Sequence, residues 1–316
     1  TERCAVGAMD AAREGSSVYE DGRLVSARFG QAVRELATGE AWGCMALTEP
    51  GAGSDLAAIA ARAAQRRGRW EVDGEKCFVS CGDARHQLVL ARTEEAPGLD
   101  GLSLLLVRRG PEVRLIGLDQ KLGQRAVATV SIEYRGAPGE LVGRRGEGFR
   151  QVLSLMNAAR VGVGLQAVGI AEGALRRARA FAAGRRTMGR PIDRHELVAE
   201  KLFEAELQIA GLRALAFEAV DATGLARELA VKLQCSPPID PGARARLAAR
   251  HEECSRRARR LTPLLKYLAA ERCVAVARDA LQIFGGAGYL DATGVHGRLR
   301  DALALPIYEG TSQIQA

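Results

Sequence analysis

The chain has 316 residues, of which 47% are hydrophobic and 4% aromatic, and its formal net charge is +7. This length suffices for one large domain or two to three small domains that bury real cores. The positive charge comes almost entirely from arginine, because the five lysines are at positions 76, 121, 201, 232 and 266. No basic run is interleaved with aromatic residues, so we expect phosphate-bearing small molecules rather than nucleic acid as ligands.

The sulfur and imidazole side chains predict no metal centre. Seven cysteines form no Cys-x-x-Cys pair, and the four histidines are widely spaced. We therefore expect reduced thiols, several of them in cores, and no zinc site. We find no apolar run of membrane-spanning length and no signal-peptide pattern, and we expect a cytoplasmic protein without a membrane partner.

The first 145 residues predict strands rather than long helices. Residues 1–40 are polar and predict one helix over 25–36, too little for a domain of its own. Short strand-like runs separated by turn residues follow. These runs are 44–47, 60–65, 69–72, 77–80, 87–91, 102–107, 113–118 and 128–134. Asp73-Gly74 predicts a hairpin, and the absence of long helices predicts a β-barrel or sandwich domain over residues 41–145.

Helical periodicity takes over after Gly148. Long helices are predicted over 149–183, 195–221 and 243–284, the last with a break near Pro263 as one option. They predict an antiparallel helical bundle domain over residues 146–316. The first helix carries glycines at 162, 164, 169 and 173. Each costs up to about 1 kcal/mol against alanine, so the cluster predicts close approach by a neighbouring helix or a ligand.

The end of the chain carries the residues best suited to chemistry. Glu309 precedes Gly310, which would let a substrate approach the backbone closely, and two hydroxyl residues that can begin a helix. Taken alone, Glu309 is more simply explained as a charge that complements a helix N-terminus. Two upstream segments change this interpretation: Leu-Gln-Ile-Phe-Gly-Gly-Ala-Gly-Tyr over 281–289, and Ala-Leu-Thr-Glu-Pro-Gly-Ala-Gly-Ser-Asp over 46–55. Together, in this order, the three segments resemble the acyl-CoA dehydrogenase flavoprotein family.

The resemblance implies an α+β multidomain fold, with a partial N-terminal helical region over 1–40, a middle β-barrel and a C-terminal helical bundle. It implies FAD as cofactor, and acyl-CoA or an acyl carrier protein thioester as substrate. Glu309 would take the α-hydrogen as a proton while the β-hydrogen leaves as hydride to flavin N5, giving a trans-2-enoyl thioester. An electron-transfer flavoprotein would be the acceptor, and the family implies a homodimer or homotetramer.

The resemblance also assigns residues to the cofactor. Leu47 and Thr48 would meet the flavin edge, and Gly53 and Ser54 the pyrophosphate. Phe78 and Ser80 stand where the family commonly has Trp and Thr, although a plain hairpin strand explains that segment as well. The cofactor residues implied further along the chain are Arg185, Met188, Gln282, Gly285, Gly286, Thr311 and Gln313.

Some of these residues would act across a subunit interface. Residues 185–189 resemble an Arg-x-Thr-Phe-Gly segment that reaches FAD from a neighbouring subunit, with Met188 in place of the aromatic residue. An exposed basic cluster at a helix end is the simpler alternative. The implied substrate-binding residues are Ser54, Asn157, Arg160, Tyr308 and Gly310. We interpret the Arg300-Asp301 pair as structural.

The resemblance spans about residue 40 to the end, and both ends are shorter than in family members. Either the chain is a fragment, or stretches are missing from it, or a partner supplies the missing wall of the acyl pocket. The long segment 222–260 is similar to larger bacterial members, including the 3-methylmercaptopropionyl-CoA dehydrogenase-like group. Two other functions stay open: a non-dehydrogenating relative that binds flavin, acyl thioester or DNA, and one subunit of a heteromeric dehydrogenase.

Overall fold

The computed structural model describes residues 18–20, 23–26, 28–235 and 240–316. The chain divides into two compact units. The first comprises residues 1–121 and 125–156, and the second comprises 122–124 and 157–316.

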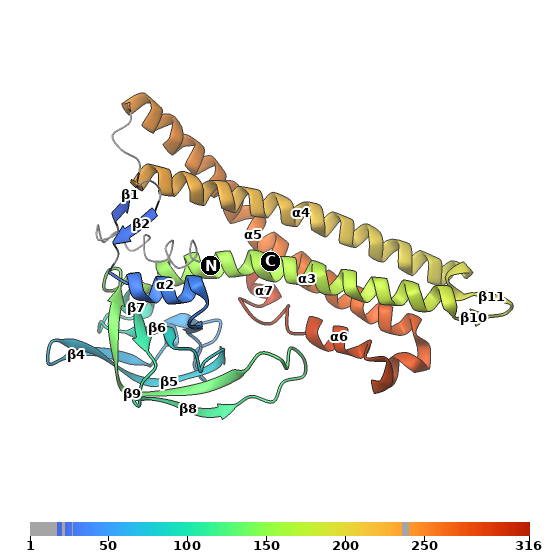
Figure 1. Ribbon diagram of the computed structural model, residues 1–316, viewed down its shortest axis with the longest axis horizontal. Coiled ribbons are helices and arrows are strands. Elements are labelled where there is room, and N and C mark those ends of the chain that lie inside the picture. Colours follow the sequence, from blue (N-terminus) through green and yellow to red (C-terminus); the bar gives the residue numbers. More distant parts are fainter. Residues whose placement is uncertain (1–17, 21–22, 27, 236–239) are drawn as a thin grey trace. The chain divides into compact units, whose positions relative to one another are not determined.

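The first unit is built on a β-barrel, as expected. Its strands are β3 (Gly43–Ala46), β4 (Arg62–Arg66), β5 (Arg69–Ser80), β6 (His86–Arg92), β7 (Leu102–Arg108), β8 (Val113–Leu118) and β9 (Thr129–Val142). The pairings run β6–β4–β5–β9–β7 and return to β6, with β3 beside β6 and β8 beside β9 (Figure 1). Because strand side chains alternate between faces, β7 buries Leu105 and Val107 in one apolar cluster, and Leu104 and Leu106 in another.

The predicted hairpin at Asp73-Gly74 is wrong, because both residues lie inside the continuous strand β5. The register with β9 shifts there, and Gly74 has φ +138, where a Cβ would lie 2.7 Å from the Cβ of Ala61. The turn between β4 and β5 is instead at Arg67-Gly68, with φ values of +51 and +79. Two consecutive positive φ angles are typical of the turn whose twist matches a two-residue hairpin.

The predicted helix over 25–36 begins too early. The structure has the antiparallel strands β1 (Val18–Glu20) and β2 (Arg23–Ser26), and then helix α2 (Gly30–Thr38). Valine, tyrosine and leucine suit the paired strands, and the left-handed Gly39 ends the helix. The remainder of the expected N-terminal region, residues 1–17, lies outside the described residues.

The second unit is a bundle of long helices, which confirms the predicted fold class. Helices α3 (Gly148–Gly184), α4 (Glu196–Cys235) and α5 (Pro241–Ile283) run antiparallel (Figure 1). Residues 148–156, at the start of α3, are counted in the first unit. The short helices α6 (His296–Ala302) and α7 (Ser312–Gln315) follow, and the strands β10 (Arg186–Thr187) and β11 (Arg190–Pro191) form a hairpin after α3. The core is rich in alanine, which lets the helices approach closely.

Helix α4 is longer than predicted, and α5 is one continuous helix. Helix α5 continues through Pro263, whose missing N–H removes one backbone hydrogen bond. The neighbouring Thr262 and Leu265 are buried, and tertiary packing of this kind supplies most of a helix's stability. At its start, the Asp240 side chain accepts a hydrogen bond from the N–H of Ala243, as an N-cap residue does. Of the predicted linker, 236–239 lie outside the described residues.

One helix in the described part of the chain, α3, is long and apolar enough by composition to cross a membrane, contrary to our expectation. An 18-residue window within it has a mean hydropathy of 1.2, and 33% of that window is buried in the structure. Its buried residues include Ala167, Ala171 and Ala174, which lie in the core of the second unit. A core helix of a soluble protein passes the same test of length and composition.

The glycines of α3 differ in their surroundings. A Cβ at Gly164 would lie 2.5 Å from Cγ of Leu265 on α5, whereas one at Gly162 or Gly169 would meet no atom of the described residues within 4 Å. At Gly173 the nearest atom, on Arg298, would be at an ordinary 3.7 Å. Close helix approach therefore explains Gly164 and not the whole cluster.

We expect Gly164→Ala to destabilise the protein by about 1–3 kcal/mol, because the added methyl group overpacks the fully buried Leu265. Gly162→Ala is the matched control on the same helix. It should raise stability by up to about 1 kcal/mol through helix propensity. Urea unfolding of the two variants measures the difference, and equal shifts of the same sign would contradict the packing shown here.

Candidate functional site

The turn at Glu309-Gly310, between α6 and α7, has an unusual backbone. Glu309 has φ +56 and Gly310 has φ +88, and a non-glycine residue in this region costs of order 1–3 kcal/mol unless its surroundings hold it there. Arg160 Nε on α3 donates to the carbonyl oxygen of Glu309 at 3.1 Å. Lys266 Nζ on α5 donates to the carbonyl oxygen of Gly310 at 2.6 Å. The turn is therefore held from two helices.

The residues after the turn are fixed as well. Ser312 Oγ donates to Oε1 of Glu271 on α5 at 2.5 Å, and its N–H donates to the carbonyl of Pro306 at 2.9 Å. Thr311 occupies the N-cap position of α7, although its side chain makes no capping hydrogen bond. The φ of Gly310 lies in the left-handed region, which favours a glycine over any residue with a Cβ at this position.

The Glu309 carboxyl has the electrostatics of a base. Burial raises its pKa, and the nearby Arg160 and Lys266 cations act in the opposite direction. Arg160 Nη1 also donates to Oδ1 of Asn157 at 2.9 Å, which orients the guanidinium. A carboxyl with a raised pKa accepts a proton more readily than an ordinary glutamate. The structure thus brings Asn157, Arg160, Glu309 and Gly310 together.

Two residues beside Glu309 have contrasting surroundings. Tyr308 donates its hydroxyl hydrogen bond to Oε1 of Gln166 at 2.8 Å, and burial raises its pKa. Ile307, in contrast, is 66% exposed, so it contributes little to the burial of Glu309.

The backbone N–H groups of Glu309 and Gly310 are available to a ligand. Neither donates to an acceptor within the described part of the chain. Because these two donors lie beside a half-buried carboxyl, they can donate to and polarise a carbonyl group of a bound molecule.

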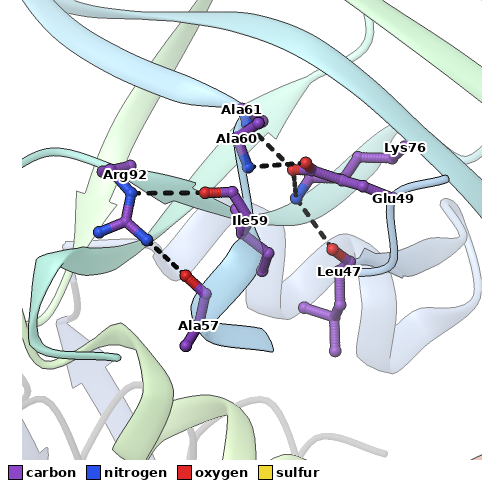
Figure 2. Close-up of polar contacts among 8 residues, drawn as sticks. All are labelled: Leu47, Glu49, Ala57, Ile59, Ala60, Ala61, Lys76 and Arg92. Carbon is purple, nitrogen blue, oxygen red and sulfur yellow. Dashed lines mark hydrogen bonds and ion pairs between the residues drawn. The ribbon is translucent and has the colours of Figure 1, made fainter. Parts of the chain in front are cut away.

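In the first unit, a buried ion pair closes the glycine-rich loop that follows β3 (Figure 2). Lys76 Nζ lies 2.7 Å from Oε1 of Glu49 and donates to the carbonyl of Leu47 at 2.9 Å. The Glu49 carboxylate also accepts from the N–H groups of Ala60, at 2.8 Å, and Ala61, at 3.1 Å. Lys76 is 0% and Glu49 8% exposed, and burial lowers the pKa of Lys76. One carboxylate therefore ties the two ends of the loop together.

Arg92 on β6 fixes the second half of the same loop (Figure 2). Its side chain donates to the carbonyls of Ala57, at 2.9 Å, and Ile59, at 3.4 Å, while its backbone N–H donates to the carbonyl of Ala61. Gly53 and Ser54, between the two anchored ends, are exposed.

The predicted flavin residues of the first unit form one group. The N–H of Cys77 donates to the carbonyl of Thr48 at 2.9 Å, so β5 lies beside the start of the loop. Phe78 has φ +56 where the register with β9 shifts, and its side chain is 70% exposed. An irregularity in the strand thus presents an aromatic ring to the surface.

This group suits a flavin nucleotide. The hydroxyls of Thr48, Ser54 and Ser80 make no hydrogen bond to any side chain or backbone group that the structure describes. Free hydroxyls, an exposed aromatic ring and a loop in which Gly51 and Gly53 carry no side chain are the donors and surfaces that ring edges and phosphates require.

A third group lies at the far end of α3. Met188 has φ +51 at the tip of the β10–β11 hairpin, and its side chain is 93% exposed. The rings of Phe181 and Phe284 stack with centroids 4.2 Å apart, which joins the ends of α3 and α5. The group consists of the exposed residues Arg185, Met188, Gln282, Gly285 and Gly286.

The third group is remote from Glu309 within one chain. Helix α3 continues for 24 residues from Arg160 to Gly184, which corresponds to about 36 Å at the helical rise. These residues therefore do not share a site with Glu309 of the same chain.

Sequence reasoning missed Lys266, Glu271 and the Glu49–Lys76 pair. Lys266 is one of few lysines and lies within an apolar helical stretch, and this was the signal that it is buried. Oδ1 of Asp301, in the Arg300-Asp301 pair that we interpreted as structural, accepts from the N–H of Gln124 at 2.6 Å.

Comparison with known proteins agrees with the motifs. Residues 44–137 match the acyl-CoA dehydrogenase middle domain, and residues 146–235 and 243–316 match the acyl-CoA dehydrogenase C-terminal domain. The chain is 38% identical to 3-methylmercaptopropionyl-CoA dehydrogenase of Ruegeria pomeroyi, covering 89% of this chain and 50% of that protein. It therefore spans half the length of that relative.

Two further proteins extend the comparison. The acyl-CoA dehydrogenase of Bacillus subtilis is 31% identical, and the match covers 90% of this chain and 68% of that protein. The solved structure of butyryl-CoA dehydrogenase from Megasphaera elsdenii superposes with a TM-score of 0.76 at 26% identity, covering 90% of this chain and 68% of that chain.

Proposed function

Because the chain belongs to the acyl-CoA dehydrogenase family, we propose that it dehydrogenates an acyl thioester between the α- and β-carbons, with FAD as cofactor and Glu309 as base. The observation that carries the proposal is the Glu309 turn. A half-buried carboxyl of raised pKa lies beside backbone N–H groups that have no partner among the described residues, in a turn whose carbonyl oxygens are held by two cations from two helices.

Each part of the turn has a role in this reaction. The Glu309 carboxylate removes the α-hydrogen as a proton, and the Glu309 N–H stabilises the negative charge that develops on the thioester oxygen. Arg160 holds the Glu309 carbonyl and thereby fixes the peptide unit that carries the Gly310 N–H, directly after the base. Bound FAD would supply the hydride acceptor for the β-hydrogen, so the product would be a trans-2-enoyl thioester. An electron-transfer flavoprotein would be the partner that takes up the electrons.

We propose cofactor contacts in each unit by itself. Those of the first unit are Leu47, Thr48, Gly53, Ser54, Phe78 and Ser80, and those after the base in the second unit are Thr311 and Gln313. The third group, around Met188, is about 36 Å along α3 from Arg160. We therefore assign it to the FAD of a neighbouring copy in a homodimer or homotetramer.

An anaerobic titration of the flavin-loaded protein with a panel of acyl thioesters tests this function. The panel contains straight-chain and branched acyl-CoAs, 3-methylmercaptopropionyl-CoA and acyl carrier protein thioesters. We expect one class to bleach the flavin absorbance and to yield the enoyl product by mass spectrometry. A flavin that binds stoichiometrically and is reduced by no member of the panel would contradict dehydrogenation and favour a non-dehydrogenating relative.

A further inference from the structure

Lys266 is a buried cation in the second unit. Its side chain is 0% exposed, and an ammonium group out of water is costly unless it is paired and hydrogen-bonded. Its Nζ donates to the carbonyl of Gly310 at 2.6 Å. The charged groups that act on it are Glu309 in the turn, Arg160 on α3 and Glu271 on its own helix.

The arrangement pairs two cations with two consecutive carbonyls. Arg160 holds the carbonyl of Glu309, and Lys266 holds the carbonyl of Gly310. Because a peptide unit is planar and trans, each held carbonyl also sets the direction of the next N–H group. The two peptide units that follow the base are therefore both fixed. This holds the backbone of residues 309 and 310 in the left-handed region.

We propose that Lys266 is a positioning residue for the base, holding the Glu309-Gly310 turn through the Gly310 carbonyl and favouring the ionised form of Glu309. This inference rests on the proposed function, in which Glu309 removes the α-proton. It assigns the lysine an electrostatic role besides its hydrogen bond.

Lys266 carries its positive charge at the neutral pH at which the enzyme would work. Burial and the charge of Arg160 lower its pKa to about 8, so the amine is mostly protonated at neutral pH. This positive charge lowers the pKa of Glu309 against the effect of burial. Removing it raises the pKa of Glu309, so the carboxyl becomes protonated, and inactive as a base, at a higher pH than in the wild type.

The test compares Lys266→Met, Lys266→Gln and Lys266→Arg with the control Lys232→Met, which changes an exposed lysine paired with Glu228 on α4. The pH dependence of kcat/KM is measured with the thioester that reduces the flavin. We expect Met and Gln to shift the acid limb upward by about one to three pH units. Arg should retain the wild-type limb, and so should the control.

A second readout does not depend on activity. Infrared spectroscopy of the carboxylic acid band, taken as the difference from Glu309→Gln, titrates the Glu309 carboxyl in each variant. The same upward shift is expected in Lys266→Met, or in Lys266→Gln if the methionine variant does not fold. An unchanged titration together with an unchanged acid limb would overturn the inference. A wild type that never reduces its flavin would overturn the proposed function instead, and the infrared titration would still decide the role of Lys266.

Discussion

A Glu309→Gln variant is expected to bind FAD as the wild type does and to lose about 10²- to 10⁴-fold in the rate of flavin reduction. Glutamine has nearly the same shape but cannot accept the proton. The backbone contacts that hold the turn come from Arg160 and Lys266 and involve carbonyl oxygens, so they survive the change. Anaerobic rapid mixing with the active thioester measures the rate.

The matched control is Glu253→Gln, which changes an exposed glutamate paired with Arg250 on α5. The flavin of this variant should be reduced at the wild-type rate. In the wild type, the rate should fall as the pH falls through the raised pKa of Glu309, because only the ionised carboxylate accepts a proton. Loss of FAD from Glu309→Gln, with the fold intact, would show that the residue serves the cofactor rather than the proton.

Lys76→Met is expected to destabilise the first unit by about 3–5 kcal/mol, because it leaves the Glu49 carboxylate buried without its cation. The double variant Lys76→Met with Glu49→Gln should lose less stability than the sum of the losses of the two single variants, since no uncompensated charge remains. Urea unfolding of the wild type, the two single variants and the double variant gives the four free energies of unfolding that this comparison needs. The same variants should bind FAD more weakly, because the pair closes the loop that carries Gly53 and Ser54.

An exposed ion pair provides the comparison. Arg179 and Glu206 are about half exposed, so Arg179→Met should cost at most about 1 kcal/mol. If Lys76→Met costs no more than this, the buried pair does not hold the loop. If stability falls but FAD affinity, measured on folded protein, is unchanged, the pair supports the barrel without positioning the cofactor loop.

The sequence was informative wherever a local pattern decides the structure. The apolar run of β7 and the long periodic helix α3 were predicted to within one or two residues. The hairpin was not, because Asp73-Gly74 and Arg67-Gly68 both carry a turn signal. The choice between them depends on pairing with β9, which is distant in sequence. Whether α5 breaks at Pro263 stayed open for the same reason, since tertiary packing carries the helix through it.

The same distinction between local patterns and distant contacts applies to the candidate site. Glu309, Arg160 and the glycine-rich loop were found because each lies in a segment that resembles a family motif. No local pattern indicates a left-handed backbone at a glutamate, since such residues are uncommon outside glycine. Likewise, the contact between Lys266 and Gly310 joins residues 44 positions apart, and only the packed helices bring them together.

Removal of the α-proton by Glu309 is tested most directly by hydrogen exchange with an acyl thioester that carries sulfur at the β-position. Such a ligand has no β-hydrogen to lose as hydride, so proton transfer at the α-carbon is the one step left to it. In D₂O, mass spectrometry should show α-deuterium incorporation with the flavin-loaded wild type and almost none with Glu309→Gln. Exchange at the wild-type rate in Glu309→Gln would contradict the assignment of this residue as the base.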